Sequence, residues 1–99
     1  MLDAHTNLKS MLKNPDLLCT KAFVGGNWVD AKSGKTFDVS NPARGDVIAT
    51  VADLDRSEIA AAIDAAQASQ KAWAGLAAKE RAKVMRKWFD LMMENQEDL

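Results

Sequence analysis

The side chains of this 99-residue chain that could carry out chemistry are few, and they lie apart from one another. Cys19 is the one cysteine and His5 the one histidine. A cysteine becomes a nucleophile when a neighbouring base or an electropositive pocket stabilises its thiolate, and a histidine binds metal together with companion ligands. The sequence meets neither condition, so we expect Cys19 to be inert and His5 to be solvent-exposed. We predict no catalytic residue and no metal site.

Gly25 and Gly26 are the nearest approach to a phosphate-binding loop. Such a loop needs the G-x-G-x-x-G pattern at the start of a helix, and both are missing here. We therefore interpret the two glycines as a tight turn and predict that the chain contains no cofactor-binding residue.

The basic residues near the C-terminus are interrupted by Glu80 and Asp90; they are Lys79, Arg81, Lys83, Arg86 and Lys87. Asp90 is spaced for an i, i+4 pair with Arg86 and an i, i+3 pair with Lys87. This pattern favours a solvated helix face over a nucleic-acid surface. The aromatic residues Trp73, Trp88 and Phe89 stand at helical spacing, which favours core or a docking surface over a stacking platform.

Composition narrows the class of protein. Hydrophobic residues make up 47% of the chain, charged residues 27%, and the net charge is -1, so nothing indicates a nucleic-acid or membrane partner. No apolar run approaches the ~20 residues of a membrane span, and the N-terminus lacks the apolar segment of a secretory signal. A single cysteine forms no internal disulfide. A cytoplasmic location is the expectation.

The elements follow from hydrophobic periodicity. Residues 1–21 are predicted to form an N-terminal arm with little structure. From residue 22 the period is two: we expect a tight hairpin at Gly25-Gly26-Asn27 and strands near 22–29, 36–40 and 47–51. Together they would form a three-stranded antiparallel meander.

Two long helices are predicted to follow, near 55–74 and 78–98. Asp55 and Glu58 are spaced for a capping box at the start of the first helix, and Gly75 is placed as the left-handed residue of a Schellman ending. Ala77 is a poor N-cap for the second helix. The short connection predicts that the two helices are spatial neighbours.

The last helix is amphipathic, with Ala78, Ala82, Met85, Trp88, Phe89 and Met92 recurring at three- and four-residue steps. Its final turn carries Glu94, Glu97 and Asp98, although the C-terminal pole of a helix prefers cations. With the helix taken to residue 98, no Gly or Asn follows it as a C-cap and no Pro stops it. This pattern predicts that the helix continues and that the chain is a fragment of a longer protein.

Several strings, in this order, resemble the N-terminal part of the NAD(P)-dependent aldehyde dehydrogenase family. They are FVGGNWVDAKSG at 23–34, FDVSNPARGDVIATV at 37–51, and AAIDAAQASQKAWAGLAAKERAKVMRKWFDLMMENQEDL at 61–99. Within that family, AAIDAA, the AKERA run and WFDLMMENQEDL are most similar to bacterial succinate-semialdehyde dehydrogenases, and NPDLL at 14–18 fits the same branch. Ala77 departs from the Ser or Thr cap that is usual there.

The resemblance implies an α+β fragment, with residues 22–99 forming the N-terminal part of a cofactor-binding domain. In the family an aldehyde adds to a cysteine thiolate, hydride passes to NAD(P), and an activated water releases the acid. For this branch the resemblance implies the conversion of succinate semialdehyde to succinate. Cys19 does not match the nucleophile's motif, so these groups and the NAD(P) site would lie downstream of Leu99. Some members bind a monovalent cation through main-chain carbonyls; the matching positions are near Val39 and Ser40, where we predict no site.

Two functions follow as expectations. The first is a structural piece of a homo-oligomeric dehydrogenase, partnered by the rest of that enzyme. The alternative is a truncated, non-enzymatic module that self-associates through exposed helix faces; a fragment with no activity of its own is the third case. In each, two helices and a meander cannot enclose all the large apolar side chains, which are Ile63, Trp73, Met85, Trp88, Phe89 and Met92. We therefore expect the isolated chain to associate with itself.

Overall fold

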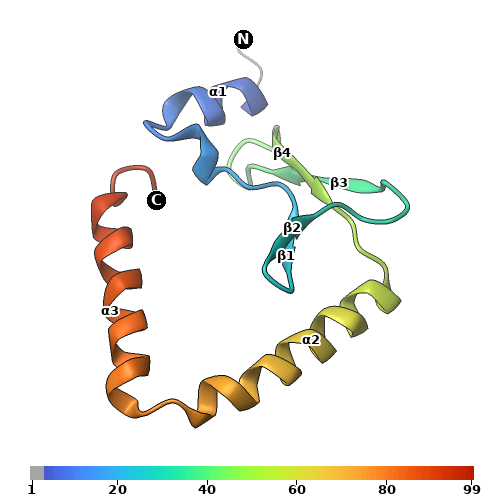
Figure 1. Cartoon of the computed structure of the whole chain (residues 1–99). Helices are drawn as coiled ribbons and strands as arrows, with labels where there is room; N and C mark the ends of the chain where they lie inside the picture. The colour runs from blue at the N-terminus through green and yellow to red at the C-terminus, as the bar shows by residue number, and fades with distance from the viewer. Residues whose placement is uncertain (1–3) are drawn as a thin grey trace.

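The structure, a computed structural model, describes residues 4–99, and their side chains from Leu8 onward; His5 therefore lies outside the described side chains. Figure 1 shows the two small hairpins together, the first long helix leading away from them, and the second running back so that the C-terminus lies near the N-terminal segment. The elements are α1 (Ala4–Met11), η1 (Pro15–Leu17), β1 (Ala22–Val24), β2 (Asn27–Val29), β3 (Thr36–Ser40), β4 (Val47–Ala52), α2 (Arg56–Gly75) and α3 (Ala78–Glu94).

The first hairpin forms where the glycines predicted it. Gly25 and Gly26 have φ of 57° and 84°, and Val24 pairs with Asn27 across the two-residue turn. A type I′ turn requires positive φ at both central residues, and glycine adopts it without a steric penalty. The rings of Phe23 and Trp28 face each other across the strands with centroids 4.9 Å apart.

The second hairpin, β3–β4, is a separate two-stranded sheet. The antiparallel pairing of 36–40 with 47–51 expected in the meander is confirmed, but the described residues form four strands in two sheets rather than three strands in one. The turn at Gly25-Gly26 divides residues 22–29 into two strands, β1 and β2, which pair with each other. The two sheets are linked near the end of β4, where the Ala52 amide donates to the Thr20 carbonyl at 2.9 Å. The predicted strands 36–40 and 47–51 are confirmed within a residue.

The start of α2 is capped as predicted. The Asp55 carboxylate accepts the Glu58 amide at 2.8 Å, and the Glu58 carboxylate accepts the Asp55 amide at 2.8 Å. The other oxygen of Glu58 accepts the Lys32 amide at 2.6 Å. This one side chain therefore joins the loop after β2 to the first turn of α2.

The end of α2 differs from the Schellman ending. Gly75 does not have positive φ; it is the last helical residue, and the Leu76 amide closes the helix on the Trp73 carbonyl. Leu76 and Ala77 are both extended, with ψ of 145° and 149°, so α3 starts in a new direction. The helices diverge instead of packing together, and the prediction that they are neighbours is wrong (Figure 1).

The predicted helix 78–98 also ends early. Ala77 provides no side-chain cap, as expected, but α3 stops at Glu94. The side-chain amide of Asn95 donates to the Leu91 carbonyl at 2.8 Å, and the Asp98 and Leu99 amides donate to the Asn95 carbonyl. Asn95 therefore supplies the stop signal that sequence reasoning overlooked.

Very little of the chain is buried. Among the described residues only the apolar side chains of Ala31 and Ala49 are buried. The accessible surface is 8146 Å² and the radius of gyration 17.0 Å, whereas a compact monomer of this mass has about 5,500 Å² and a radius of about 13 Å. Local hydrogen bonds, rather than a core, hold the elements in place.

Two glycines give a matched pair of tests for this local control. Gly26→Ala places a Cβ at φ of +84° and is expected to destabilise the hairpin by about 1–2 kcal/mol. Gly75→Ala is expected to stabilise α2 by up to about 1 kcal/mol, because its φ is ordinary for a helix. No atom lies within 4 Å of either added Cβ. The conformational preference of the backbone alone therefore decides whether each substitution raises or lowers the free energy of unfolding.

Urea titrations of both variants, followed by circular dichroism at a concentration where the chain is monomeric, measure the two effects. Shifts of the same sign in the two variants would contradict this account.

Candidate functional site

Cys19 lies on the surface beside Trp28, in a hollow of about 190 Å³ that Leu18, Thr20 and Lys21 also line. Its thiol donates to the Asp16 carbonyl at 3.5 Å. A carbonyl oxygen accepts a hydrogen bond from the neutral S–H group and does not stabilise a thiolate. In the described part of the chain, no three His, Cys, Asp or Glu side chains gather closely enough to hold a metal ion.

The described residues do not fit NAD(P). Gly25 and Gly26 turn a hairpin and are not followed by a helix. The N-terminus of α2, where a phosphate would receive backbone N–H groups, is occupied by the chain's own Asp55 carboxylate. No chemical step can therefore be derived through the cofactor from this part of the fold.

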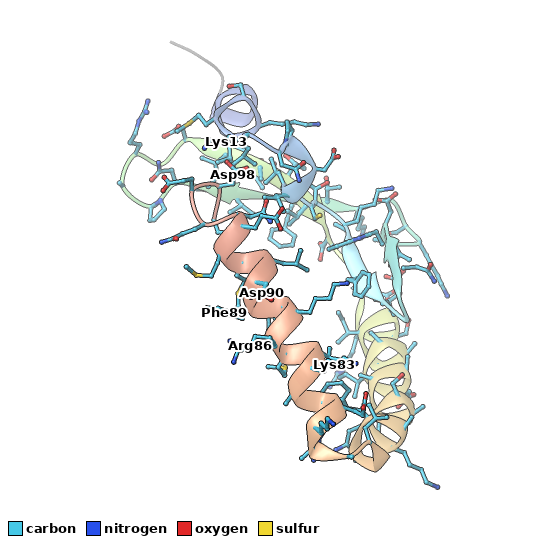
Figure 2. The ribbon with its side chains drawn as sticks, turned by 60° about the vertical axis from the view of Figure 1, so that its left-hand side comes forward. Lys13, Lys83, Arg86, Phe89, Asp90 and Asp98 are labelled. Carbon is cyan, nitrogen blue, oxygen red and sulfur yellow. The ribbon has the colours of Figure 1, made fainter. Side chains whose placement is uncertain are left out.

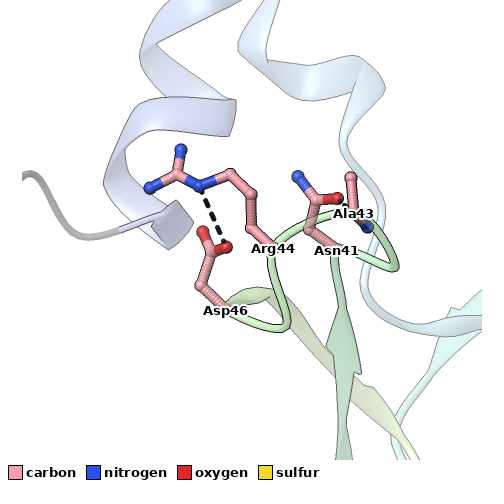
Figure 3. A network of polar contacts seen from close by, with 4 residues as sticks. All are labelled: Asn41, Ala43, Arg44 and Asp46. Carbon is pink, nitrogen blue, oxygen red and sulfur yellow. Dashed lines mark hydrogen bonds and ion pairs between the residues drawn. The ribbon is translucent and has the colours of Figure 1, made fainter.

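Val39 and Ser40, where the sequence predicted no cation site, lie at a bulge in β3, where Ser40 pairs with Val47. The loop that follows is closed by its own contacts (Figure 3). The Asn41 side chain accepts the Ala43 amide at 2.9 Å, and Arg44 Nε lies 3.5 Å from Asp46 Oδ1. These contacts close the loop around Pro42.

The basic residues of α3 make different contacts from those predicted. Among the described residues, neither Arg86 nor Lys87 forms an ion pair with Asp90, whereas Lys21 pairs with Asp30 and Arg44 with Asp46. The Arg86 guanidinium instead lies 5.9 Å from the centre of the Phe89 ring. Figure 2 shows Lys83, Arg86, Phe89 and Asp90 along the exposed length of α3.

The large apolar side chains of α2 and α3 form the most extensive feature of the surface. Six of them define what we call the apolar docking surface, and all are between 39% and 60% exposed: Ile63, Trp73, Met85, Trp88, Phe89 and Met92. No residue of either helix is buried. Large apolar side chains exposed to this extent on two helices are typical of a segment that contacts another protein segment.

A cleft of about 360 Å³ lies between the first hairpin and the start of α2. Val24, Val29, Leu54 and Ala61 give it an apolar lining, and Glu58 lies at its edge. The Glu58 carboxylate already accepts two backbone amides, so the cleft offers no spare polar group at that point for a ligand.

Asp98 is a further residue of interest, and sequence reasoning missed its role. Its two carboxylate oxygens accept the backbone amides of Lys13 and Asn14, each at 2.9 Å. These two hydrogen bonds hold the pKa of the Asp98 carboxyl below its usual value, since they stabilise the charged form. We call this arrangement the Asp98 clamp; it joins the segment after α3 to the N-terminal arm (Figure 2).

The Asp98 clamp and Arg81 hold α3 at its two ends. Near the start of the helix, the Arg81 guanidinium donates to the Ala74 carbonyl at 3.2 Å.

In the described part of the chain, no helix combines the length and apolar character needed to cross a bilayer.

Comparison with known proteins gives consistent matches. The model of the aldehyde dehydrogenase family matches residues 28–99. Over 88 residues the chain is 49% identical to the glutarate-semialdehyde dehydrogenase of Pseudomonas aeruginosa and 47% identical to the NADP(+)-dependent succinate-semialdehyde dehydrogenase of Escherichia coli. Each alignment covers 89% of this chain and 18% of the relative, so the chain spans about a fifth of their length.

The crystal structure of an aldehyde dehydrogenase from Brucella melitensis biovar abortus superposes with a TM-score of 0.82 at 48% identity. That superposition also covers 89% of this chain and 18% of the solved one. The hairpins and diverging helices are therefore a conformation that this sequence type adopts within a larger protein.

The Asp98 clamp predicts a specific mutational effect. Asp98→Ala removes both acceptors, so the amides of Lys13 and Asn14 are expected to exchange with solvent faster, while those of α2 do not change. Hydrogen exchange followed by NMR measures this. Glu97→Ala is the matched control, because it removes a neighbouring carboxylate that accepts neither amide. Equal exchange rates in the two variants would contradict the clamp.

The clamp also predicts a pH dependence. Because the pKa of Asp98 is lowered in the folded chain, the clamp is complete above the ordinary aspartate pKa of about 3.9 and is lost as pH falls through the lowered value. The amide shifts of Lys13 and Asn14 should move together in that acidic range. A midpoint at or above the ordinary value would rule the assignment out.

Proposed function

The chain belongs to the aldehyde dehydrogenase family, and we propose on that premise that the complete protein oxidises a short semialdehyde with NAD(P). The observation that carries this proposal is the match over residues 28–99, together with close similarity to dehydrogenases of glutarate and succinate semialdehyde. Both of those aldehydes carry a carboxylate at the far end. Succinate semialdehyde is the first substrate to test and NADP the first cofactor.

The role proposed for the chain itself is structural. Residues 22–99 belong to the N-terminal part of the cofactor-binding domain, and residues 1–21 form an arm in front of it. The apolar docking surface supports this role, because its six side chains are large, exposed and carried on two rigid helices. The rest of the dehydrogenase is the partner that would cover them.

The reacting groups are assigned to the part of the dehydrogenase that this chain does not span. The overall reaction converts aldehyde, water and oxidised NAD(P) to carboxylate, reduced NAD(P) and two protons. It needs a nucleophile, a base and a cofactor site, and Cys19, with a carbonyl as its partner, is not assigned to the nucleophile. The chain alone is proposed to be inactive and to bind no NAD(P).

Glutarate semialdehyde differs from succinate semialdehyde by one additional methylene group. A difference of that size in a binding pocket changes the free energy by about 1–3 kcal/mol, which is roughly 10- to 200-fold in rate. The residues that would distinguish the two substrates by length are assigned to the part of the enzyme outside this chain. A homo-oligomeric, cytoplasmic enzyme is the assembly and location we propose with it.

A longer gene product and the 99-residue chain should differ completely in activity. We expect turnover of succinate semialdehyde with NADP from the longer product only, and no calorimetric signal when NADP is titrated into the short chain. Cys19→Ala in the longer product should leave kcat unchanged. Micromolar NADP affinity in the short chain, or activity lost with Cys19→Ala, would overturn the assignment.

The structural role makes a separate prediction. When residues 1–99 are supplied in trans to the remainder of the dehydrogenase, the two parts should associate and recover activity. Trp88→Asp places a carboxylate in the docking surface and should abolish recovery, whereas Lys79→Glu on the polar face should have little effect. Co-purification and NADPH formation report the two outcomes. Equal recovery with both variants would show that α3 does not dock through Trp88.

A further inference from the structure

The described part of the N-terminal arm is attached to β4 at two places. At the first, α1 lies against β4 (Figure 1). Leu8 and Leu12, four residues apart, are half-buried, whereas Met11 is 76% exposed. Because β4 is the strand that α1 contacts, the side of the arm that carries the two leucines faces the hairpin. At the second place, the Thr20 carbonyl accepts the Ala52 amide at 2.9 Å.

Between these two places the arm holds the end of α3. The Asn14 side chain accepts the Asp16 amide at 3.2 Å and Pro15 begins η1, so the backbone direction is fixed at this point. The amides of Lys13 and Asn14 both donate to Asp98, each at 2.9 Å. Two hydrogen bonds to one carboxylate fix its orientation as well as its distance. In the described part of the chain, α3 has no contact with another element as extensive as that of α1 with β4.

The connection between α2 and α3 leaves the direction of α3 open. Leu76 and Ala77 are extended, no residue of either helix is buried, and Ala77 provides no side-chain cap. The hydrogen bond from Arg81 to the Ala74 carbonyl crosses this connection at 3.2 Å. Because α3 is about 25 Å long, a rotation of about 10° at the connection moves its far end by about 4 Å. The Asp98 clamp does not tolerate a displacement of that size.

We propose that the N-terminal arm is a strap that couples hairpin β3–β4 to the far end of α3. The position of α1 on β4 determines where Lys13 and Asn14 lie, and their two amides determine where α3 ends. The strap thereby sets the direction in which α3 presents its part of the apolar docking surface. The alternative is that the connection at Leu76 and Ala77 sets this direction by itself. The inference concerns contacts within the 99-residue chain and is independent of the reaction of the complete enzyme.

Distances between pairs of spin labels test the coupling. In a Cys19→Ser background, Lys35→Cys places a label beside β3, and the second label is placed by Asp90→Cys on α3 or by Lys71→Cys on α2. We call the two measured quantities the hairpin–α3 distance and the hairpin–α2 distance. The second is the internal control, because Glu58 holds the start of α2 without the strap. Dilution with unlabelled chain removes distances between copies, and double electron–electron resonance measures both quantities.

Removal of the Asp98 clamp should release α3 and leave α2 in place. We expect Asp98→Ala to broaden the hairpin–α3 distance by about 3 Å or more, because Asp90 lies about 18 Å from the start of α3 and a rotation of about 10° moves it that far. Glu97→Ala is the matched control and should leave both distances unchanged. If Asp98→Ala changes neither distance, or if Arg81→Ala broadens the hairpin–α3 distance more, the proposal is wrong.

The far end of the strap provides a second test. Leu8→Ala removes a half-buried side chain of α1 and should broaden the hairpin–α3 distance, since a looser arm no longer fixes the clamp. Met11→Ala makes a similar truncation at an exposed position of the same helix and should have no effect. Equal results for the two variants, or a change in the hairpin–α2 distance with Leu8→Ala, would overturn the proposal.

Discussion

The carboxylate of Glu58 is the contact on which the arrangement of this chain depends most. It accepts the Asp55 amide with one oxygen and the Lys32 amide with the other, so it is at once part of a helix cap and a bond to the preceding loop. The chain changes there from strand to helix. Because the cap fixes the first turn of α2, and Lys32 fixes where that turn lies, the direction of the whole helix follows from this side chain.

Asp98 has the same role at the other end of the molecule, where it accepts the amides of Lys13 and Asn14. In both places a single carboxylate satisfies two backbone donors that belong to different segments. Charge-assisted hydrogen bonds of this kind are directional, and their geometry therefore fixes positions that an apolar core would fix in a compact domain. Ala31 and Ala49, the buried apolar residues among those described, are too small to form such a core.

The open arrangement is consistent with membership of the aldehyde dehydrogenase family. The chain matches about 18% of its relatives' length, yet it superposes on a solved member with a TM-score of 0.82. Its conformation is therefore one that occurs within a larger solved protein, and the six residues of the apolar docking surface are exposed in it.

Local sequence patterns determined the elements themselves. Gly25 and Gly26 specified the first turn, since both positions need positive φ, and Asp55 with Glu58 specified the start of α2 through contacts within one turn. The family resemblance rested on strings of this local kind.

Relations between distant segments were decided only by the tertiary structure. The link between the two sheets at Thr20 and Ala52 and the Asp98 clamp each depend on groups far apart in the chain. Periodicity shows that a helix has an apolar face but not what covers that face, so Trp88 and Met85 were consistent with either a core or a docking surface. The extended backbone of Leu76 and Ala77 separates the helices, and nothing in those two side chains encodes that angle.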